Sequence, residues 1–184
     1  MAIKTNIDGV IVLKPSVYRD GRGIFMELYS QKKYFSHGIT EKCVQQNYSH
    51  SKKNVLRGLH YQVKKPQGKI IQVINGTIFD VGVDIRRNSP TYGHSFSIQL
   101  DDKDYRQVYF PPGIAHGFCV LSEYADVVYQ CTEFYDPDDE NGVLWSDPAL
   151  EIDWPITDPI ISNRDQSYKK LCDISPKMLP ISTL

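Results

Sequence analysis

The chain has 184 residues, of which 41% are hydrophobic and 23% charged, with a formal net charge of -1. This length suits a single domain, 1–184, with its own hydrophobic core. A net charge near zero argues against a nucleic-acid-binding surface, which requires a basic excess. No apolar run approaches the roughly 20 residues of a membrane span, and no signal peptide is visible. We therefore expect a cytoplasmic protein with neither nucleic acid nor membrane as partner.

Strand signals dominate the chain. After a short helix around 30–36, the apolar run 70–74 and the run 77–84 flank Asn75-Gly76. This dipeptide is typical of a type I′ turn, so we expect a hairpin. Turn clusters separate further predicted strands at 95–100, 107–110, 117–121 and 125–134. A second short helix is expected over 164–171, and the segment 145–184, rich in Pro and Asp, is expected to wrap the surface. Many short strands indicate an all-β antiparallel sandwich or barrel.

The four cysteines indicate the compartment. They form no CxxC pair and none lies at metal-ligand spacing to a histidine. Cys119 and Cys131 lie in apolar runs and are expected to be buried free thiols. Free thiols favour a reducing environment, in agreement with the cytoplasm.

Alternation along the strands predicts which side chains face inward. Lys69 shares a face with Ile71 and Val73, and Tyr129 shares a face with Ala125 and Val127. Both faces are apolar, so Lys69 and Tyr129 are expected in the interior. A buried lysine is costly unless it is paired or neutral.

Arg57, His60 and Lys69 supply a candidate base and two cations within one hairpin-like stretch. A histidine suits proton abstraction near neutral pH, a lysine can stabilise an oxyanion, and Tyr129 can return a proton. Taken alone, His60 can also be read as a structural strand histidine, and Tyr129 as a core tyrosine. A carboxylate to orient His60 is missing nearby; Asp165 is one candidate, which nothing local singles out.

His116 follows a Pro-Pro-Gly turn and is consistent with the mouth of a barrel or with a structural turn histidine. The remaining histidines lie in polar stretches and are expected on the surface. A metal-binding barrel would show His-x-His followed by Glu, whereas Gln62 stands two residues after His60 and Lys64, Lys65 and Pro66 follow. Cations there would oppose a metal. We therefore expect no metal and no cofactor.

These residues belong to a longer series of motifs that resembles the dTDP-4-dehydrorhamnose 3,5-epimerase family of metal-free cupins. The resemblance covers nearly the whole chain. Its motifs are Asp20-Gly21-Arg22-Gly23, Gln45-Gln46-Asn47, 54–62, Gln67-Gly68-Lys69, 79–86, 112–118, Tyr129, Tyr135, Asp147-Pro148 and 152–155. So many ordered matches make an accidental similarity improbable.

The resemblance implies a cupin-type jelly-roll β-barrel with short peripheral helices, forming a homodimer that exchanges N-terminal strands. It implies an isomerase that epimerises dTDP-4-dehydro-6-deoxy-D-glucose at C3 and C5. His60 would then be the base, Asp165 its partner, Lys69 the group facing the C4 oxygen, and Tyr129 the acid.

The resemblance also implies a set of substrate contacts, some supplied by the partner subunit from the segment 22–27. These contacts are Arg22, Phe25, Glu27, Gln45, Gln46, Asn47, Arg57, His116, Tyr135, Glu140 and Arg164. Tyr135 corresponds to the residue that stacks on thymine. Position 164 is Arg where the family commonly has Lys, which keeps the charge and changes its geometry.

Three rival hypotheses remain at this point. The enzyme could epimerise only C3 or only C5 of a related 4-keto nucleotide sugar. It could be a metal-dependent cupin oxygenase, against which Gln62 argues. It could be a non-catalytic sugar-nucleotide-binding module, which the combination of base, cation and acid disfavours.

Overall fold

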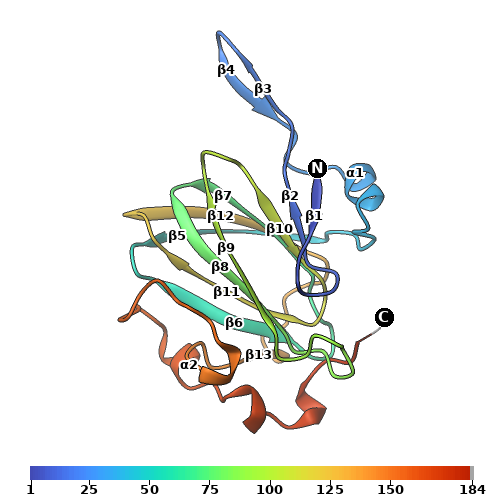
Figure 1. Cartoon of the computed structure of the whole chain (residues 1–184), viewed down its shortest axis with the longest axis vertical. Coiled ribbons are helices and arrows are strands. Elements are labelled where there is room, and N and C mark those ends of the chain that lie inside the picture. The colour runs from blue at the N-terminus through green and yellow to red at the C-terminus, as the bar shows by residue number, and fades with distance from the viewer. Residues whose placement is uncertain (183–184) are drawn as a thin grey trace.

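The computed structural model describes residues 1–182 and consists mainly of two antiparallel sheets that face each other (Figure 1). The helices are short and peripheral: α1 (Gln31–Ser36), α2 (Asn163–Gln166) and the 3₁₀ turns η1 (Pro148–Leu150), η2 (Leu171–Asp173) and η3 (Pro176–Met178). The predicted all-β jelly-roll class with short peripheral helices is confirmed. Within the described residues, no helix is long and apolar enough to cross a membrane.

One sheet has six strands in the spatial order β1-β2-β10-β7-β12-β5. Its strands are β1 (Ala2–Lys4), β2 (Ile11–Leu13), β10 (Gln107–Phe110), β7 (Lys69–Asn75), β12 (Tyr124–Cys131) and β5 (Gln45–Lys52). The other has five strands in the order β13-β6-β11-β8-β9. Its strands are β13 (Glu140–Gly142), β6 (Leu56–Gln62), β11 (Ile114–Val120), β8 (Thr77–Asp84) and β9 (Ser95–Asp101).

The main core fills the space between the two sheets. Ile71 and Val73 of β7 and Val127 of β12 meet Ile78 of β8 and Phe118 of β11 there. The opposite faces of both sheets are also covered. Side chains of α1 and its flanks pack against Ile70 and Tyr109. This arrangement confirms the predicted inward parity of β7 and β12, because the even residue Ile70 lies in the outer cluster.

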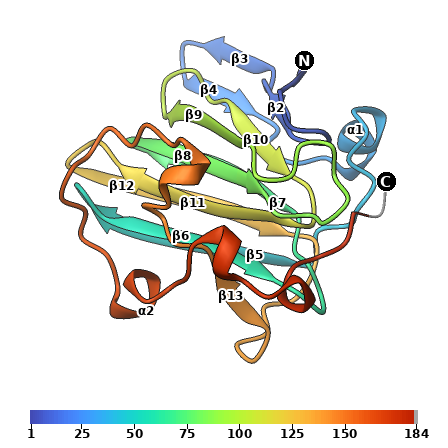
Figure 2. The ribbon, with the colours of Figure 1, turned by 60° about the horizontal axis from the view of Figure 1, so that its bottom comes forward.

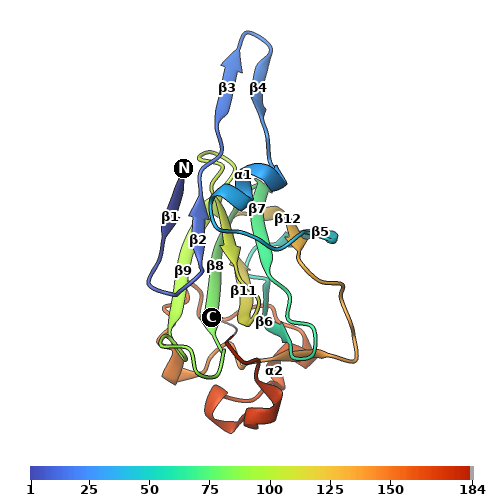
Figure 3. The ribbon, with the colours of Figure 1, turned by 90° about the vertical axis from the view of Figure 1, so that its right-hand side faces the viewer.

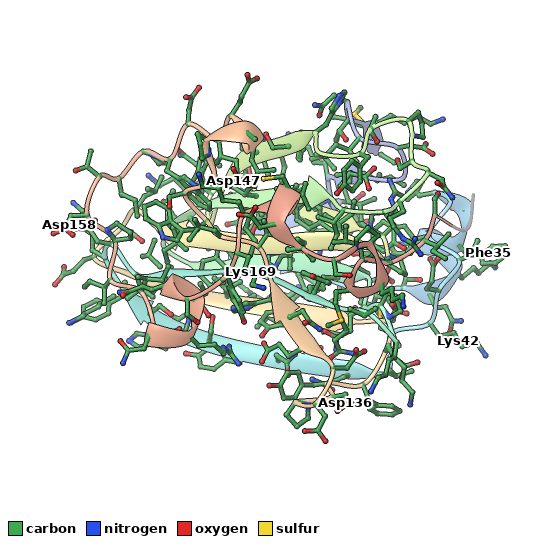
Figure 4. The ribbon with its side chains drawn as sticks, turned by 90° about the horizontal axis from the view of Figure 1, so that it is seen from below. Phe35, Lys42, Asp136, Asp147, Asp158 and Lys169 are labelled. Carbon is green, nitrogen blue, oxygen red and sulfur yellow. The ribbon has the colours of Figure 1, made fainter. Side chains whose placement is uncertain are left out.

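The C-terminal segment lies across the outer face of the five-stranded sheet (Figure 2). Leu150, Leu171 and Leu179 from this segment pack against Leu59 and Val81 of the sheet. Figure 4 shows Asp147 and Lys169 over the sheet and Asp158 projecting outward at its edge. Residues 183 and 184, the last two of the predicted wrapping segment, lie outside the described residues.

A hairpin of β3 (Val17–Asp20) and β4 (Gly23–Met26) stands away from the barrel (Figures 1 and 3). Its aromatic side chains are largely exposed, with Phe25 at 71% and Tyr18 at 63% of full accessibility. Tyr18 and Phe25 face each other across the hairpin with ring centroids 6.5 Å apart. An exposed apolar arm of this kind is typical of a contact surface.

The hairpin predicted at Asn75-Gly76 is wrong. β7 and β8 belong to different sheets, and the turn carries the chain from one sheet to the other. Gly76 has φ +85° whereas Asn75 does not have positive φ, so the type I′ pattern is absent. The Gly76 N–H donates to Asp102 at 2.8 Å, and the Thr77 N–H donates to the Ser122 hydroxyl at 2.8 Å. The turn therefore bonds to neighbouring loops instead of closing a two-stranded ladder.

The predicted boundaries of the other helices and strands differ less from the structure. α1 confirms the helix predicted over 30–36, whereas the helix predicted over 164–171 is only one turn, α2. β11 begins at Ile114 because the residues after the Pro-Gly turn already pair with β8. β12 ends at Cys131, and the next residue, Thr132, accepts a hydrogen bond from the Gly68 N–H through its hydroxyl. Strand β5 was not predicted, since its sequence is polar and one face is exposed.

We predict that Gly76→Ala is more damaging than Gly93→Ala. Both glycines have positive φ, but a Cβ at Gly76 would lie 2.2 Å from the Tyr124 carbonyl oxygen, whereas Gly93 has nothing within 4 Å. The conformational cost at Gly93 is about 1 kcal/mol. Steric overlap should add roughly 1–3 kcal/mol at Gly76. Urea unfolding of both variants measures this difference, and equal losses would contradict the sheet-crossing role of Gly76.

Candidate active site

A cavity of about 320 Å³ opens between the two sheets, a size typical of small-molecule sites. It is lined by polar and aromatic side chains from both sheets. These are Gln45, Asn47, Arg57, His60, Tyr61, Gln62, Gln67, Lys69, His116, Phe118, Tyr129, Tyr135, Glu140 and Arg164. Ten residues predicted from sequence are in this set; Asp165, the eleventh, lies directly behind His60.

A shift of register in β6 brings Arg57 and His60 to the same cavity. Residues three apart on a regular strand point to opposite faces. Here His60 is opposite His116 and Arg57 is opposite Phe118, so β6 holds one residue more than β11 over this interval. This is the geometry of a β-bulge. Gly58 has φ +125°, and a Cβ there would lie 2.5 Å from the Gly117 Cα, so only glycine fits.

His60 and Asp165 form a close pair behind the cavity wall. His60 Nε2 lies 2.9 Å from Asp165 Oδ1, and the Gly58 N–H donates to Asp165 Oδ2 at 3.1 Å. Ser162 caps helix α2 by accepting from the Asp165 N–H, which fixes this residue at the helix start. With its Nε2 proton directed at Asp165, His60 presents an unprotonated Nδ1 to the cavity.

The hydrogen-bond partners of Asp165 keep its carboxyl group ionised. Burial would raise the pKa of this carboxyl, but His60 and the Gly58 N–H together lower it to about 2. Asp165 is therefore ionised at neutral pH and can stabilise a positively charged imidazole. The geometry provides the orienting carboxylate that local sequence reasoning could not select.

Lys69 and Tyr129 face His60 from the other sheet. Lys69 is buried, and its Nζ lies 3.5 Å from the His60 carbonyl oxygen. Burial lowers the pKa of Lys69 and raises the pKa of Tyr129. The phenol is thus protonated at neutral pH. The cavity consequently has an imidazole on one wall and a protonated phenol on the opposite wall.

A charged cluster closes one side of the cavity. Glu140 accepts a hydrogen bond from the Tyr135 hydroxyl at 2.7 Å and pairs with the Arg164 guanidinium. Its other oxygen lies 4.0 Å from His60 Nδ1. The Tyr135 backbone N–H donates to Gln45 at 2.9 Å, which ties this loop to β5. The arginine at position 164 thus joins both Glu140 and, at 3.5 Å, Asp165.

His116 extends the cavity inward. Its Nε2 lies 2.7 Å from Oδ1 of Asp80, and both side chains are buried. Burial lowers the pKa of His116 and raises the pKa of Asp80. The structure therefore contains a second histidine–carboxylate pair beside the first, which the sequence analysis did not identify.

Gln62, which occupies a position expected of a ligand in metal-binding barrels, has another role. Its amide donates to the Lys65 and Phe134 carbonyls, and its oxygen accepts from the Asp136 N–H at 3.0 Å. It therefore joins the loop after β6 to the loop that carries Tyr135. Among residues 1–182, no group of three or more His, Cys, Asp or Glu is placed to hold a metal ion.

Four predicted contact residues lie outside this cavity. Arg22, Phe25 and Glu27 belong to the protruding hairpin and its exit, where Arg22 pairs with Asp20 and Glu27 with Lys33. Gln46 alternates out of the cavity and accepts from Gln130 on the outer face. The prediction that Gln46 contacts substrate with its neighbours overlooked this alternation.

Four lining residues were not predicted as site residues, namely Tyr61, Gln62, Gln67 and Phe118. Gln67 and Phe118 stand in quoted motifs, but a loop glutamine and a strand phenylalanine carry no distinctive chemical signal. Asp80 is also absent from the predicted set. The signal that could have identified it is the charged residue at an inward position of an otherwise apolar strand.

The fold and the cavity define a cupin-type barrel enzyme with an acid–base site. The family model described as dTDP-4-dehydrorhamnose 3,5-epimerase matches residues 4–173. The chain belongs to this family, as the motifs predicted.

Individual relatives are similar over most of this chain. The dTDP-4-dehydrorhamnose 3,5-epimerase of Methanothermobacter thermautotrophicus is 47% identical, over 92% of this chain and 93% of that protein. A Legionella pneumophila dTDP-6-deoxy-D-glucose-3,5-epimerase, solved with dTDP-4-keto-L-rhamnose, superposes with TM-score 0.96 at 43% identity, covering 100% and 99% of the chains. A 3′-monoepimerase from Streptomyces bikiniensis, solved with dTDP-quinovose, gives TM-score 0.89 at 30% identity over 96% and 91%.

We predict that the contribution of Asp165 to stability depends on pH. Its pKa falls from 3.8 to about 2 on folding, so its stabilising effect is present above about pH 4 and is lost as the pH falls towards 2. The free energy of unfolding of Asp165→Asn should therefore be about 2 kcal/mol lower than that of the unmodified protein at pH 7. This difference in stability should become smaller in acid. Urea unfolding between pH 7 and pH 2 measures it.

The matched control for this experiment is Asp158→Asn, which neutralises an exposed carboxylate of the same segment (Figure 4). This variant should follow the unmodified protein at every pH. If the stability difference between Asp165→Asn and the unmodified protein stays constant from pH 7 to pH 2, the result would argue against an ionised Asp165 paired with His60.

Proposed function

We propose that the protein converts dTDP-4-dehydro-6-deoxy-D-glucose to dTDP-4-dehydro-L-rhamnose by inverting C3 and C5. The observation that carries this function is the placement of His60 and Tyr129 on opposite walls of one cavity, with Lys69 beside them. Membership of the epimerase family supports the same reaction. The substrate follows from the relatives, whose solved complexes contain dTDP sugars.

The reaction begins with proton abstraction. C3 and C5 both lie next to the C4 ketone, so their protons are acidic. Nδ1 of His60 takes the proton, and Asp165 stabilises the resulting imidazolium through the bond to Nε2 at 2.9 Å. The electron pair of the broken C–H bond moves towards the C4 oxygen and forms an enolate.

Lys69 stabilises this enolate. A cation already placed in a dry cavity needs little reorganisation when negative charge develops on the oxygen. Burial lowers the pKa of Lys69, which also brings the ammonium proton closer to transfer. Loss of such a donor typically slows a reaction by roughly a hundred- to a thousand-fold.

Tyr129 completes the inversion. It belongs to the six-stranded sheet, whereas His60 belongs to the five-stranded sheet. A sugar between the sheets therefore meets the base on one face and the phenol on the other. Proton donation from Tyr129 to the face opposite His60 reverses the configuration. Each transfer moves protons only, with no net oxidation.

The other lining residues are suited to a charged nucleotide sugar. Arg57 and Arg164 can bind the two phosphates, and Tyr135 presents a ring for the thymine. Gln45, Asn47, His116 and Glu140 supply hydrogen-bonding groups around the sugar and nucleotide. The cavity thus contains charge complementary to dTDP in a protein whose net charge is only -1.

The functional unit in this proposal is a homodimer. The β3–β4 hairpin places Arg22 and Phe25 away from the cavity of its own chain, and both side chains are exposed. Exchange of N-terminal strands would bring these residues and Glu27 to the cavity of the partner. We also infer a cytoplasmic location, which is supported by four cysteines that remain unpaired within residues 1–182.

Epimerisation at a single carbon is the alternative. A 3′-monoepimerase shares this fold at 30% identity. The greater identity to 3,5-epimerases favours inversion at both carbons.

We predict that the protein incorporates deuterium at both C3 and C5 of dTDP-4-dehydro-6-deoxy-D-glucose in deuterated water. His60→Ala should abolish incorporation while retaining dTDP binding, because the base is removed and the phosphate contacts remain. NMR of the sugar measures label at each carbon. Label at one carbon would favour the mono-epimerase, and label at neither would contradict the enzyme proposal.

We predict that Arg22 acts in the site of the partner subunit. Arg22→Ala and His60→Ala homodimers should each be impaired. Unfolding and refolding a mixture of the two should restore activity, because half of the sites in each mixed dimer receive an intact Arg22 and an intact His60. Activity that stays at the level of the unmixed variants would place Arg22 in its own chain's site, or outside the site.

A further inference from the structure

Asp80 is the most deeply buried charged residue beside the cavity, and the proposed reaction gives it no role. Its side chain is 0% accessible and points from β8 into the space between the sheets. Alternation supports this direction, since Ile78 lies in the inner core whereas Val81 and Val83 lie in the outer cluster. Burial of a carboxylate in this position costs free energy of folding. Its presence therefore calls for a functional reason.

The only hydrogen bond of the Asp80 side chain among residues 1–182 is to His116. Oδ1 lies 2.7 Å from His116 Nε2, whereas Oδ2 is buried without a partner. The imidazole is held between Phe110 and Phe118, with ring centroids 5.2 and 6.3 Å away. These contacts leave the ring little freedom to turn, so its two nitrogen atoms have fixed directions.

The pair repeats the arrangement at His60. Both histidines use Nε2 to bond a buried aspartate. His60 and His116 are directly opposite each other in the β6–β11 pairing. Both line the same cavity. A carboxylate bonded to one nitrogen keeps the proton there and leaves the other nitrogen as an acceptor.

A nearby cation opposes the effect of burial on Asp80. Burial raises the pKa of Asp80, and the charge of Lys69, which lines the same cavity, acts in the other direction. Asp80 in turn favours the charged form of Lys69. An ionised Asp80 accepts a hydrogen bond from the Nε2–H group of a neutral His116. The proton then stays on Nε2, and Nδ1 is unprotonated.

We propose that Asp80 is a positioning residue, which holds His116 in the tautomer with its proton on Nε2 so that Nδ1 accepts a hydrogen bond from a hydroxyl of the bound sugar. This inference rests on the proposed function. The bond would hold the ring between His60 and Tyr129 while its carbons invert. Asp80 should therefore affect the rate of inversion more than the binding of the nucleotide.

The tautomer can be observed directly in the unmodified protein. The chain has 5 histidines, so nitrogen NMR of the imidazole rings can be assigned by substitution. The expected result is a protonated Nε2 and an unprotonated Nδ1 for His116 at neutral pH. A proton on Nδ1 would overturn the proposal, and this measurement requires no substrate.

Variants test whether Asp80 acts through His116. Asp80→Asn should slow deuterium exchange at C3 and C5 by about 10- to 100-fold, with the affinity for dTDP unchanged. His116→Gln should slow exchange at least as much. In the double variant, Asp80→Asn should cost less than about two-fold beyond His116→Gln, because interacting residues are not additive. If the double variant loses rate by the product of the two single-variant losses, the proposal is overturned.

The matched control is Asp84→Asn on the same strand and face. Asp84 is equally buried but bonds Arg86, Ser89 and Thr91 outside the cavity. This variant should lose stability while the exchange rate and the His116 ring signals stay unchanged. A similar rate loss in Asp84→Asn would show that any charge removed from β8 has this effect. Absence of exchange in the unmodified protein would contradict the proposed function and leave the tautomer measurement intact.

Discussion

One extra residue in β6, at Gly58, sets the geometry on which the site depends. The register shift turns both Arg57 and His60 towards the cavity, although regular alternation would separate them. The Gly58 N–H donates to Asp165 instead of to the neighbouring strand, and so anchors the carboxylate that orients His60. A side chain at this position would collide with Gly117. His60, Arg57 and Asp165 are thus coupled through one glycine.

The charges around the cavity are arranged in pairs with different exposures. Asp165 and Asp80 lie behind the two histidines in buried positions, whereas Glu140 pairs with Arg164 and Tyr135 nearer to solvent. A buried carboxylate keeps a fixed direction and is little affected by salt, which suits the control of a tautomer. A more exposed pair can exchange its partners when a charged ligand enters. The cavity therefore combines a buried inner part with a more exposed outer part.

The sequence predicted the fold class and the inward faces of two strands, because alternation is a local property. Lys69 and Tyr129 were placed correctly by this argument, and the motifs identified the family. Asp165 could not be chosen from local pattern, since it meets His60 across 105 residues. Asp80 was missed because one charge in an apolar strand does not reveal its partner. The Asn75-Gly76 prediction failed for a related reason: turn preferences describe the bend of the chain and not whether its two strands remain in one sheet.

This failed hairpin also explains why the site can invert a carbon centre. Had β7 and β8 paired, Lys69 and Asp80 would belong to one sheet, and the residues around them would approach a substrate from one side. The crossing at Gly76 instead places β7 with β12 and β8 with β11. Lys69 and Tyr129 consequently face His60 and His116 across the cavity. Inversion requires proton removal and return on opposite faces of the sugar, and a barrel formed from two facing sheets provides these two directions through its topology.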